Sequence, residues 1–312
     1  MQTISLIVPC YNEHETIEIF YNEAIKYFDD SHNFNIIFVN DGSKDNSLDI
    51  MKDLAKKDSR VKYVGFSRNF GKEAAMYAGL EAAKALDSDA AIIMDVDLQD
   101  PPYLLPQFLQ KHEEGYNLIY ARQRNRKGAK AFSKFCSLSF YKVYSKLTGD
   151  KQMSNGARDY CLLDKKVIDA FLKIRDEKRF TKGIYHYVGF KTTTIEFDYE
   201  KRVAGTTKWN FIKLLKYAFV GIQEFSRYYL LIPKLLIFIT LVIGCYDIVQ
   251  NIVNCVIASD INVWNWVPLR IDGAVLAILI AIFYLMALLY DVRDQARNRP
   301  VYICEDSNVE SK

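Results

Sequence analysis

The chain has 312 residues, more than one average domain, and its 41 basic and 38 acidic side chains nearly balance. This balance argues against binding of nucleic acid through bulk charge, although basic residues gather in segments 122–134 and 201–216. The 6 cysteines show no CxxC and no metal-ligand spacing, which favours reduced thiols facing a cytoplasm over a disulfide framework. Because the chain opens with a strand-like segment, we expect no signal peptide.

The first part of the chain, residues 1–121, alternates between strand and helix patterns. Strands are predicted at 4–8, 35–39, 61–66, 90–94 and 117–120, and helices at 15–28, 47–57, 71–86 and 104–114. Strands separated by helices of this length predict crossover connections and a largely parallel sheet in an α/β fold. Ligands of such sheets bind beyond the carboxyl ends of the strands. These ends carry neither a GxGxxG nor a P-loop motif, which argues against a dinucleotide dehydrogenase and a P-loop NTPase.

Acidic residues follow the predicted strand at 90–94. Five apolar residues lead into Asp95, which predicts a buried strand that ends in carboxylates. Asp95 and Asp97 are two positions apart, so on an extended backbone their side chains leave the same face. Two such carboxylates suit Mg²⁺ or Mn²⁺, and an acidic turn after a strand is the alternative interpretation.

The segment 122–150 combines basic with aromatic residues, and 131–147 is amphipathic. This pattern is typical of an interfacial helix that faces anionic head groups, or of a soluble helix with a solvated basic face. A further strand is predicted at 192–199. A basic, glycine-containing loop at 201–209 and a helix at 210–228 follow it.

Two apolar stretches, 230–257 and 274–290, predict a pair of transmembrane helices. Asp247 interrupts the first stretch, and we expect it to face a protein partner or the far interface. Basic residues flank the outer ends of the pair, whereas the loop between contains only Arg270, so the positive-inside rule places both termini in the cytoplasm. Two buried helices of a soluble domain are the alternative.

Five segments together resemble the family 2 glycosyltransferases of the polyisoprenyl-phosphate type, and especially the bacterial undecaprenyl-phosphate glucosyltransferases. They are Val8–Glu13, Val39–Ser43, Ser67–Lys72, Asp95–Pro101 and Arg202–Trp209. Dolichol-phosphate mannose synthases are related to the same group. The resemblance implies a GT-A fold with a Rossmann-like, mostly parallel sheet, followed by amphipathic interface helices and two transmembrane helices. It also implies a nucleotide-sugar donor, Mg²⁺ or Mn²⁺, and a polyprenyl-phosphate acceptor.

Carried over position by position, the resemblance implies a role for each matching residue. The nucleotide would be bound by Pro9, Tyr11, Glu13, Asp41, Lys72, Asp95 and Lys208. The metal would be held by Asp95, Asp97 and Gln99. The catalytic residues would be Asp97, Asp159 and Arg202, and the acceptor phosphate would be bound by Arg122, Arg126 and Lys130.

Simpler roles remain open for three of these acids. Asp41 could cap the next helix, and Glu13 could be an acid of the first helical turn. Asp159 could form an ion pair with Arg158 or cap a helix.

The expected organisation is a catalytic domain at 1–200, a basic loop with a juxtamembrane helix at 201–229, a transmembrane pair at 230–292 and a cytoplasmic tail at 293–312. The resemblance implies inverting transfer of one sugar, from UDP-glucose or UDP-N-acetylglucosamine, to undecaprenyl phosphate. We expect a homo-oligomeric, multi-pass protein of the bacterial inner membrane with a cytoplasmic catalytic domain and no nucleic-acid partner. The alternatives are a GDP-mannose-dependent polyprenyl-phosphate mannosyltransferase and a non-catalytic membrane scaffold of the same fold.

Overall fold

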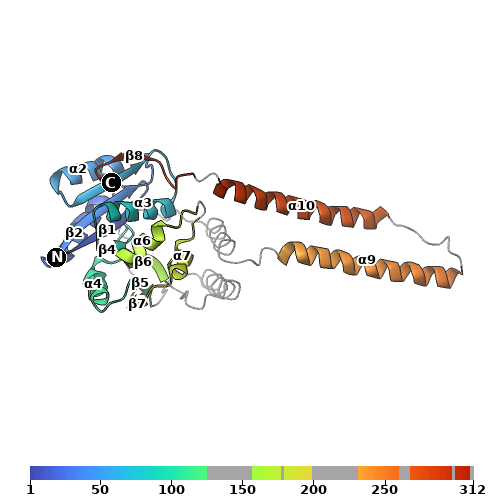
Figure 1. Ribbon diagram of the computed structural model, residues 1–312. Coiled ribbons are helices and arrows are strands. Elements are labelled where there is room, and N and C mark those ends of the chain that lie inside the picture. The colour runs from blue at the N-terminus through green and yellow to red at the C-terminus, as the bar shows by residue number, and fades with distance from the viewer. Residues whose placement is uncertain (125–156, 177–178, 199–230, 260–267, 297–298, 310–312) are drawn as a thin grey trace. The chain divides into compact units, whose positions relative to one another are not determined.

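The computed structural model describes residues 1–124, 157–176, 179–198, 231–259, 268–296 and 299–309 (Figure 1). The chain divides into two compact units. Unit 1 comprises Met1–Phe225 and Pro300–Lys312, and unit 2 comprises Ser226–Arg299. The predicted amphipathic segment 131–147, the basic loop at 201–209 and the helix at 210–228 lie outside the described residues.

In the described part of unit 1, 8 strands form one sheet in the order β7-β5-β6-β4-β1-β2-β3-β8. Their bounds are Gln2–Cys10 (β1), His32–Asn40 (β2), Val61–Phe66 (β3), Ala90–Ile93 (β4), Leu118–Gln123 (β5), Ala157–Asp164 (β6), Thr192–Phe197 (β7) and Cys304–Ser307 (β8). β1 pairs in parallel with β2 and β4, β2 with β3, and β5 with β7. β6 lies antiparallel between β4 and β5, and β8 pairs antiparallel with β3. The predicted α/β fold with a mostly parallel sheet is confirmed.

Helices cover both faces of the sheet (Figure 1). They are Ile17–Ala24 (α1), Ser47–Lys57 (α2), Lys72–Ala85 (α3), Leu105–Glu113 (α4), Lys165–Leu172 (α6) and Thr181–Val188 (α7), with short 3-10 turns at Ile25–Tyr27 and Pro102–Leu104. α1, α2 and α4 pack in one hydrophobic cluster, and α3, α6 and α7 pack in the other. β1 serves both clusters because its side chains alternate, with Leu6 on one side and Ile7 on the other.

A glycine allows α3 to pack closely against β1. A Cβ at Gly79 would lie 2.1 Å from Cγ2 of Ile7, which is fully buried. The helix backbone therefore lies directly on the strand, and the start of α3 comes to the carboxyl edge of the sheet.

The acidic segment departs from its expected conformation. β4 ends at Ile93, and residues 96 and 97 form a turn. The expectation that Asp95 and Asp97 leave one face of an extended strand is therefore wrong, because the strand ends before Asp95 and the backbone turns at residues 96 and 97.

Unit 2 contains two long helices, α9 at Leu231–Ala258 and α10 at Pro268–Ala296. Within them, Lys234–Ala258 and Gly273–Arg293 are long and apolar enough to cross a membrane. Their apolar side chains point outwards, and Leu241 is 62% exposed and Phe283 75% exposed. In the described residues, these helices are therefore not the buried core of a soluble domain.

Candidate functional site

The loops after β1 and β2 are joined by hydrogen bonds. The backbone N–H of Asn12 donates to Oγ of Ser43, and that of Glu13 donates to Oγ of Ser47, both over 2.9 Å. The backbone N–H of Lys44 donates to Oδ1 of Asn12 over 2.8 Å. Asn12 has a φ of 52°, in the left-handed region that asparagine tolerates better than most residues. These hydrogen bonds hold together the loops that follow β1 and β2 at the carboxyl edge of the sheet. Both loops belong to the predicted nucleotide-binding segments.

Asp41, directly after β2, organises the loop that precedes α3. Its carboxylate accepts hydrogen bonds from the backbone N–H groups of Phe70 (2.6 Å) and Gly71 (3.0 Å) and from Nδ2 of Asn69 (2.9 Å). Burial raises the pKa of Asp41, although the two backbone donors act in the opposite direction. The cap position of α2 is Asn46, so Asp41 is not the cap of the next helix. Its predicted contact with the nucleotide stays a prediction.

The glycine after Asp41 is required by a close backbone approach. Gly42 has a φ of 61°, and a Cβ there would lie 2.3 Å from the carbonyl carbon of Arg68. Any side chain at this position would separate the loops that follow β2 and β3.

Glu13 lies at the start of α1. Its Oε2 accepts a hydrogen bond from Oγ1 of Thr16 over 3.2 Å, and Thr16 occupies the cap position of that helix. The structure thus gives Glu13 a local contact at a helix start, and its nucleotide role is untested.

The residues after β4 form a tight acidic turn. The backbone N–H of Asp95 donates to Oδ2 of Asp100, and that of Gln99 donates to Oδ1 of Asp97, both over 3.0 Å. Leu98, between Asp97 and Gln99, has a φ of 59°, a conformation that costs a non-glycine residue about 1–3 kcal/mol. Such strain is commonly retained at functional sites. Asp97 is only 6% exposed, whereas Asp95 is more open.

A lysine joins this turn to a second acid. Nζ of Lys72, the first residue of α3, lies 2.6 Å from Oδ1 of Asp95 and 3.0 Å from Oδ2 of Asp159 on β6. Nζ of Lys182, at the start of α7, lies 3.8 Å from Oδ1 of Asp159. Burial alone lowers the pKa of Lys72, but the carboxylates of Asp95 and Asp159 raise it above its ordinary value, so the ammonium stays charged. We call Lys72, Asp95, Asp159 and Lys182 the ion-pair cluster.

The starts of α3 and α7 are also joined directly. The backbone N–H of Thr181 donates to Oε2 of Glu73 over 3.1 Å, and the hydroxyl of Thr181 donates to the same oxygen. Glu73 and Thr181 each adjoin a lysine of the ion-pair cluster, so this contact fixes the spacing of the two lysines.

Arg122, predicted to bind the acceptor phosphate, lies near the end of β5. Its Nη2 is 2.8 Å from Oε1 of Glu196 on β7, and Nε of Arg124 is 3.3 Å from Oε2 of the same residue. The structure thus pairs Arg122 with an acid on the neighbouring strand. The other predicted acceptor-phosphate residues, Arg126 and Lys130, and the predicted diphosphate residues, Arg202 and Lys208, lie outside the described residues.

The acidic turn fits a cation that is shared with a substrate. In the described ranges no group of three or more His, Cys, Asp or Glu side chains is placed to hold a metal ion. Mg²⁺ typically binds one or two carboxylates together with substrate phosphates rather than a complete protein cage. Asp95 and Asp97 supply such carboxylates, with Gln99 in the same turn, so this donor set fits Mg²⁺ or Mn²⁺ held jointly with a diphosphate.

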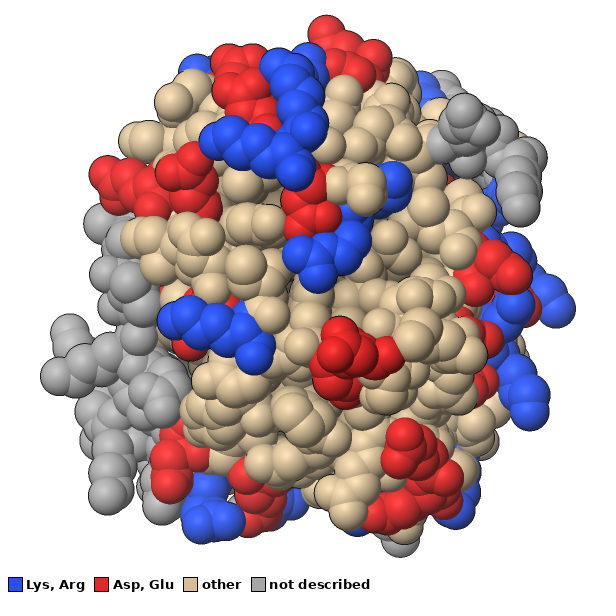
Figure 2. Space-filling view, turned by 90° about the vertical axis from the view of Figure 1, so that its left-hand side faces the viewer, with Lys and Arg blue, Asp and Glu red and all other residues tan. Residues whose placement is uncertain are grey.

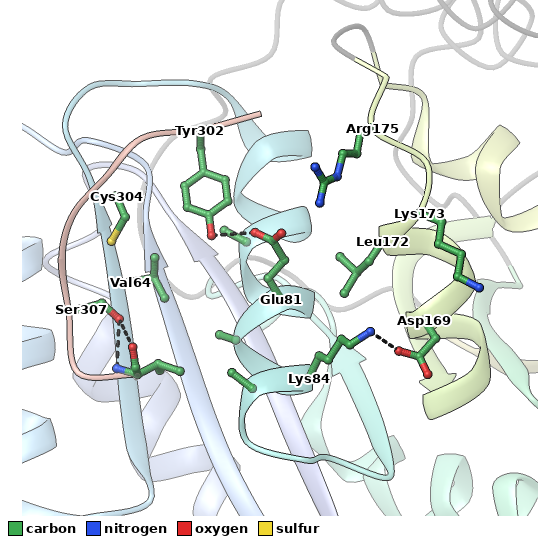
Figure 3. Close-up of a pocket in the computed structure, with 14 residues that line it drawn as sticks. Val64, Glu81, Lys84, Asp169, Leu172, Lys173, Arg175, Tyr302, Cys304 and Ser307 are labelled. Atoms are coloured by element: carbon green, nitrogen blue, oxygen red, sulfur yellow. Dashed lines mark hydrogen bonds and ion pairs between the residues drawn. The ribbon is translucent and has the colours of Figure 1, made fainter. Parts of the chain in front are cut away.

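A groove of about 770 Å³ lies elsewhere, between α3, α6 and the C-terminal segment (Figure 3). No residue predicted for the site lines it, so we place the candidate site at the strand ends and not in this groove. Figure 2 shows another face of the protein, where acidic and basic side chains lie next to one another. This agrees with the near balance of charge in the sequence.

Sequence reasoning missed parts of this site. Lys182 and Thr181 stand in no motif, and only the fold brings α7 beside β6. Asp100 lies within the acidic segment, yet its role as acceptor for the backbone of Asp95 depends on the turn. The antiparallel pairing of β4 with β6 places Asp159 near Asp95, and no local sequence pattern predicts which strand pairs with β4.

Comparisons with known proteins show the family of the chain. Residues 5–172 match the sequence model of the family described as glycosyl transferase family 2. The uncharacterized glycosyltransferase YkcC of Bacillus subtilis is 34% identical over 99% of this chain and 95% of its own length. The prophage bactoprenol glucosyl transferase homolog of Escherichia coli is 37% identical, with 72% of each chain covered. The bactoprenol glucosyl transferase of Shigella phage SfV is 36% identical, with the same coverage.

Solved structures show a more distant likeness. Glucosyl-3-phosphoglycerate synthase from Mycobacterium tuberculosis, in complex with Mn²⁺ and UDP, is 16% identical and has a TM-score of 0.47, with 70% of this chain and 76% of that chain covered.

Proposed function

The chain belongs to glycosyltransferase family 2, and from this premise we propose that it transfers one sugar from a nucleotide-sugar to a polyprenyl phosphate at a membrane surface. The proposed donor is UDP-glucose or UDP-N-acetylglucosamine, the acceptor is undecaprenyl phosphate, and the configuration at the sugar C1 is inverted. The names of the bactoprenol glucosyl transferases that are 37% and 36% identical support the acceptor class.

One observation carries the proposal within the structure itself. The acidic turn after β4 and the ion-pair cluster lie together at the carboxyl edge of a GT-A sheet, in a chain with two candidate membrane spans. Ligands of mostly parallel sheets bind at this edge. A water-soluble donor and a lipid acceptor require both features in one protein.

The chemistry explains why charged side chains are needed. The leaving nucleoside diphosphate gathers negative charge, and a divalent cation held by Asp95 and Asp97 would stabilise that charge. Arg202 and Lys208 are proposed to bind the same diphosphate. The acceptor is a phosphate monoester whose second pKa is about 6, so it already carries its reactive charge at neutral pH.

The acceptor therefore needs orientation more than deprotonation. Asp159 is proposed as the orienting acid, since its ion pairs with Lys72 and Lys182 bring it to the acidic turn. The acceptor phosphate is proposed to bind Arg122, Arg126 and Lys130. In this proposal Arg122 exchanges its partner Glu196 for the phosphate.

Replacement of the buried acid tests the proposal. Membranes that contain the full chain should convert UDP-glucose or UDP-N-acetylglucosamine, Mg²⁺ or Mn²⁺ and undecaprenyl phosphate into a glycolipid, detected by mass spectrometry. We expect Asp97→Ala to reduce the rate at least about 100-fold, because charge stabilisation of the leaving group is lost. Asp53→Asn removes an exposed acid from α2 and should leave the rate unchanged. Retained activity in Asp97→Ala would refute the assigned role of Asp97.

Competition between donors separates the proposal from its alternatives. UDP should inhibit transfer more strongly than GDP if the donor is a UDP-sugar, whereas stronger inhibition by GDP would favour a mannosyltransferase. If no nucleotide-sugar yields a glycolipid and no nucleotide stabilises the protein against heat, the scaffold alternative gains support.

A further inference from the structure

Lys72 occupies a position that helix electrostatics disfavours. It is the first residue of α3, and a positive side chain at a helix start meets the positive end of the helix dipole. The next residue, Glu73, has the charge that this position favours. The location of the Lys72 ammonium is instead explained by its two acid partners, at 2.6 Å and 3.0 Å.

Those partners come from separate parts of the chain. Asp95 follows β4, and Asp159 lies on β6, which is antiparallel to β4. Their carboxylates approach the same ammonium, so Lys72 offsets the repulsion between them. Asp159 also has Lys182 at 3.8 Å, and it therefore keeps a cationic neighbour if Lys72 moves away.

Lys72 and a divalent cation would both bind the carboxylate of Asp95. We propose that Lys72 is a positioning residue that competes with the divalent cation for Asp95, so that the metal binds together with the donor diphosphate and not ahead of it. This inference rests on the proposed function and adds an order of binding to it. In the donor-free protein the ammonium holds Asp95 and lowers its affinity for a free cation. The phosphates of the donor supply further oxygen ligands, and with them the cation displaces Lys72 from Asp95.

Binding of Mn²⁺ to the full chain in detergent tests the inference without any transfer reaction. Electron paramagnetic resonance counts free Mn²⁺ and gives a dissociation constant with and without UDP. We expect wild-type protein to bind Mn²⁺ weakly alone and much more tightly with UDP. Lys72→Met should tighten donor-free binding about tenfold, because a positive charge next to Asp95 has been removed. Addition of UDP should then enhance binding less in this variant than in wild type.

Three further variants separate competition from a merely structural role. Lys72→Arg keeps the charge and should bind Mn²⁺ within about twofold of wild type. Lys84→Met removes a lysine from the same helix at the groove in Figure 3, where it pairs with Asp169 over 2.5 Å, and should also match wild type. Lys72→Gln should behave as Lys72→Met and replaces it if that variant does not fold.

The outcomes distinguish this inference from the function beneath it. Donor-free Mn²⁺ binding in Lys72→Met that is equal to or weaker than in wild type overturns the competition, even where UDP-dependent binding is intact. If wild-type protein shows no UDP-dependent Mn²⁺ binding, the metal-dependent function fails and the inference fails with it.

Discussion

Asp58, at the end of α2, is a single side chain whose contacts stabilise unit 1. Its carboxylate accepts hydrogen bonds from Nη2 of Arg60 (2.8 Å) and from the hydroxyl of Tyr21 (2.9 Å). The Arg60 hydrogen bonds lower the pKa of Asp58 to about 2, although burial opposes the shift. A carboxylate with a lowered pKa stabilises the folded state above its unfolded pKa, and this contribution is lost as the pH falls through the folded pKa.

Asp58→Asn should therefore destabilise the protein in a pH-dependent way. We expect the free energy of unfolding at pH 7 to fall by about 1–2 kcal/mol. This is less than the full pKa shift would give, because the Arg60 side chain is 47% exposed and solvent screens the ion pair. The gap between wild type and variant should shrink between about pH 4 and pH 2, where wild-type Asp58 becomes protonated. Thermal unfolding of the detergent-solubilised chain across this range measures the gap. A gap that stays constant down to pH 2 would contradict the assignment.

Among the elements, β8 was not expected from the sequence. The tail 293–312 was predicted only as a cytoplasmic tail, yet Cys304–Ser307 pairs with β3 at the edge of the sheet. The adjoining Tyr302 stacks on Phe66 with ring centroids 4.7 Å apart, and its hydroxyl donates to Oε2 of Glu81 on α3 over 2.8 Å (Figure 3). The tail thus adds the edge strand β8 and connects β3 with the core helix α3.

Substitution of Tyr302 should measure the worth of this connection. Tyr302→Phe loses one hydrogen bond and should cost about 1 kcal/mol, whereas Tyr302→Ala also loses the stacked ring and should cost about 2–3 kcal/mol. Tyr187→Phe is the matched control, because that side chain is 74% exposed and should tolerate the change. Melting temperatures of the full chain decide the question. Equal stability of Tyr302→Ala and wild type would show that the tail does not stabilise unit 1.

For the whole molecule, the return of the chain constrains membrane topology. Residues on both sides of unit 2 belong to unit 1, since β8 pairs with β3. If α9 and α10 both cross a membrane, the segments before and after them lie on the same side. This requirement agrees with the topology predicted from the flanking basic residues. In that topology, we propose that both termini lie in the cytoplasm.

Reporter fusions in a bacterial membrane test this arrangement. A fluorescent protein fused after Lys312 should fold and fluoresce, because we propose that this end is cytoplasmic. Alkaline phosphatase fused within 260–267 should be active, because that segment should lie on the opposite side. Alkaline phosphatase activity from a fusion after Lys312 would contradict the proposal, and inactivity at 260–267 would show that α9 does not cross.

Local patterns in the sequence determined the alternation of strands and helices, the two apolar helices and the positions of the acids at strand ends. They could do so because burial periodicity and strand-stopping residues act over a few positions. The match of α2 at Ser47–Lys57 and of β3 at Val61–Phe66 follows from such signals. The five motifs together also identified the family, whose model covers residues 5–172.

Only the tertiary structure decided which distant residues meet. The antiparallel insertion of β6 beside β4, the pairing of Lys72 with Asp95 and Asp159, and the return of β8 to β3 join segments far apart in the chain. The turn that removed Asp95 and Asp97 from an extended strand likewise depends on Asp100 and on the strained Leu98. A lysine or an aspartate has the same charge in any context, so its sequence neighbours cannot reveal its partner. Packing of the whole sheet fixes that choice.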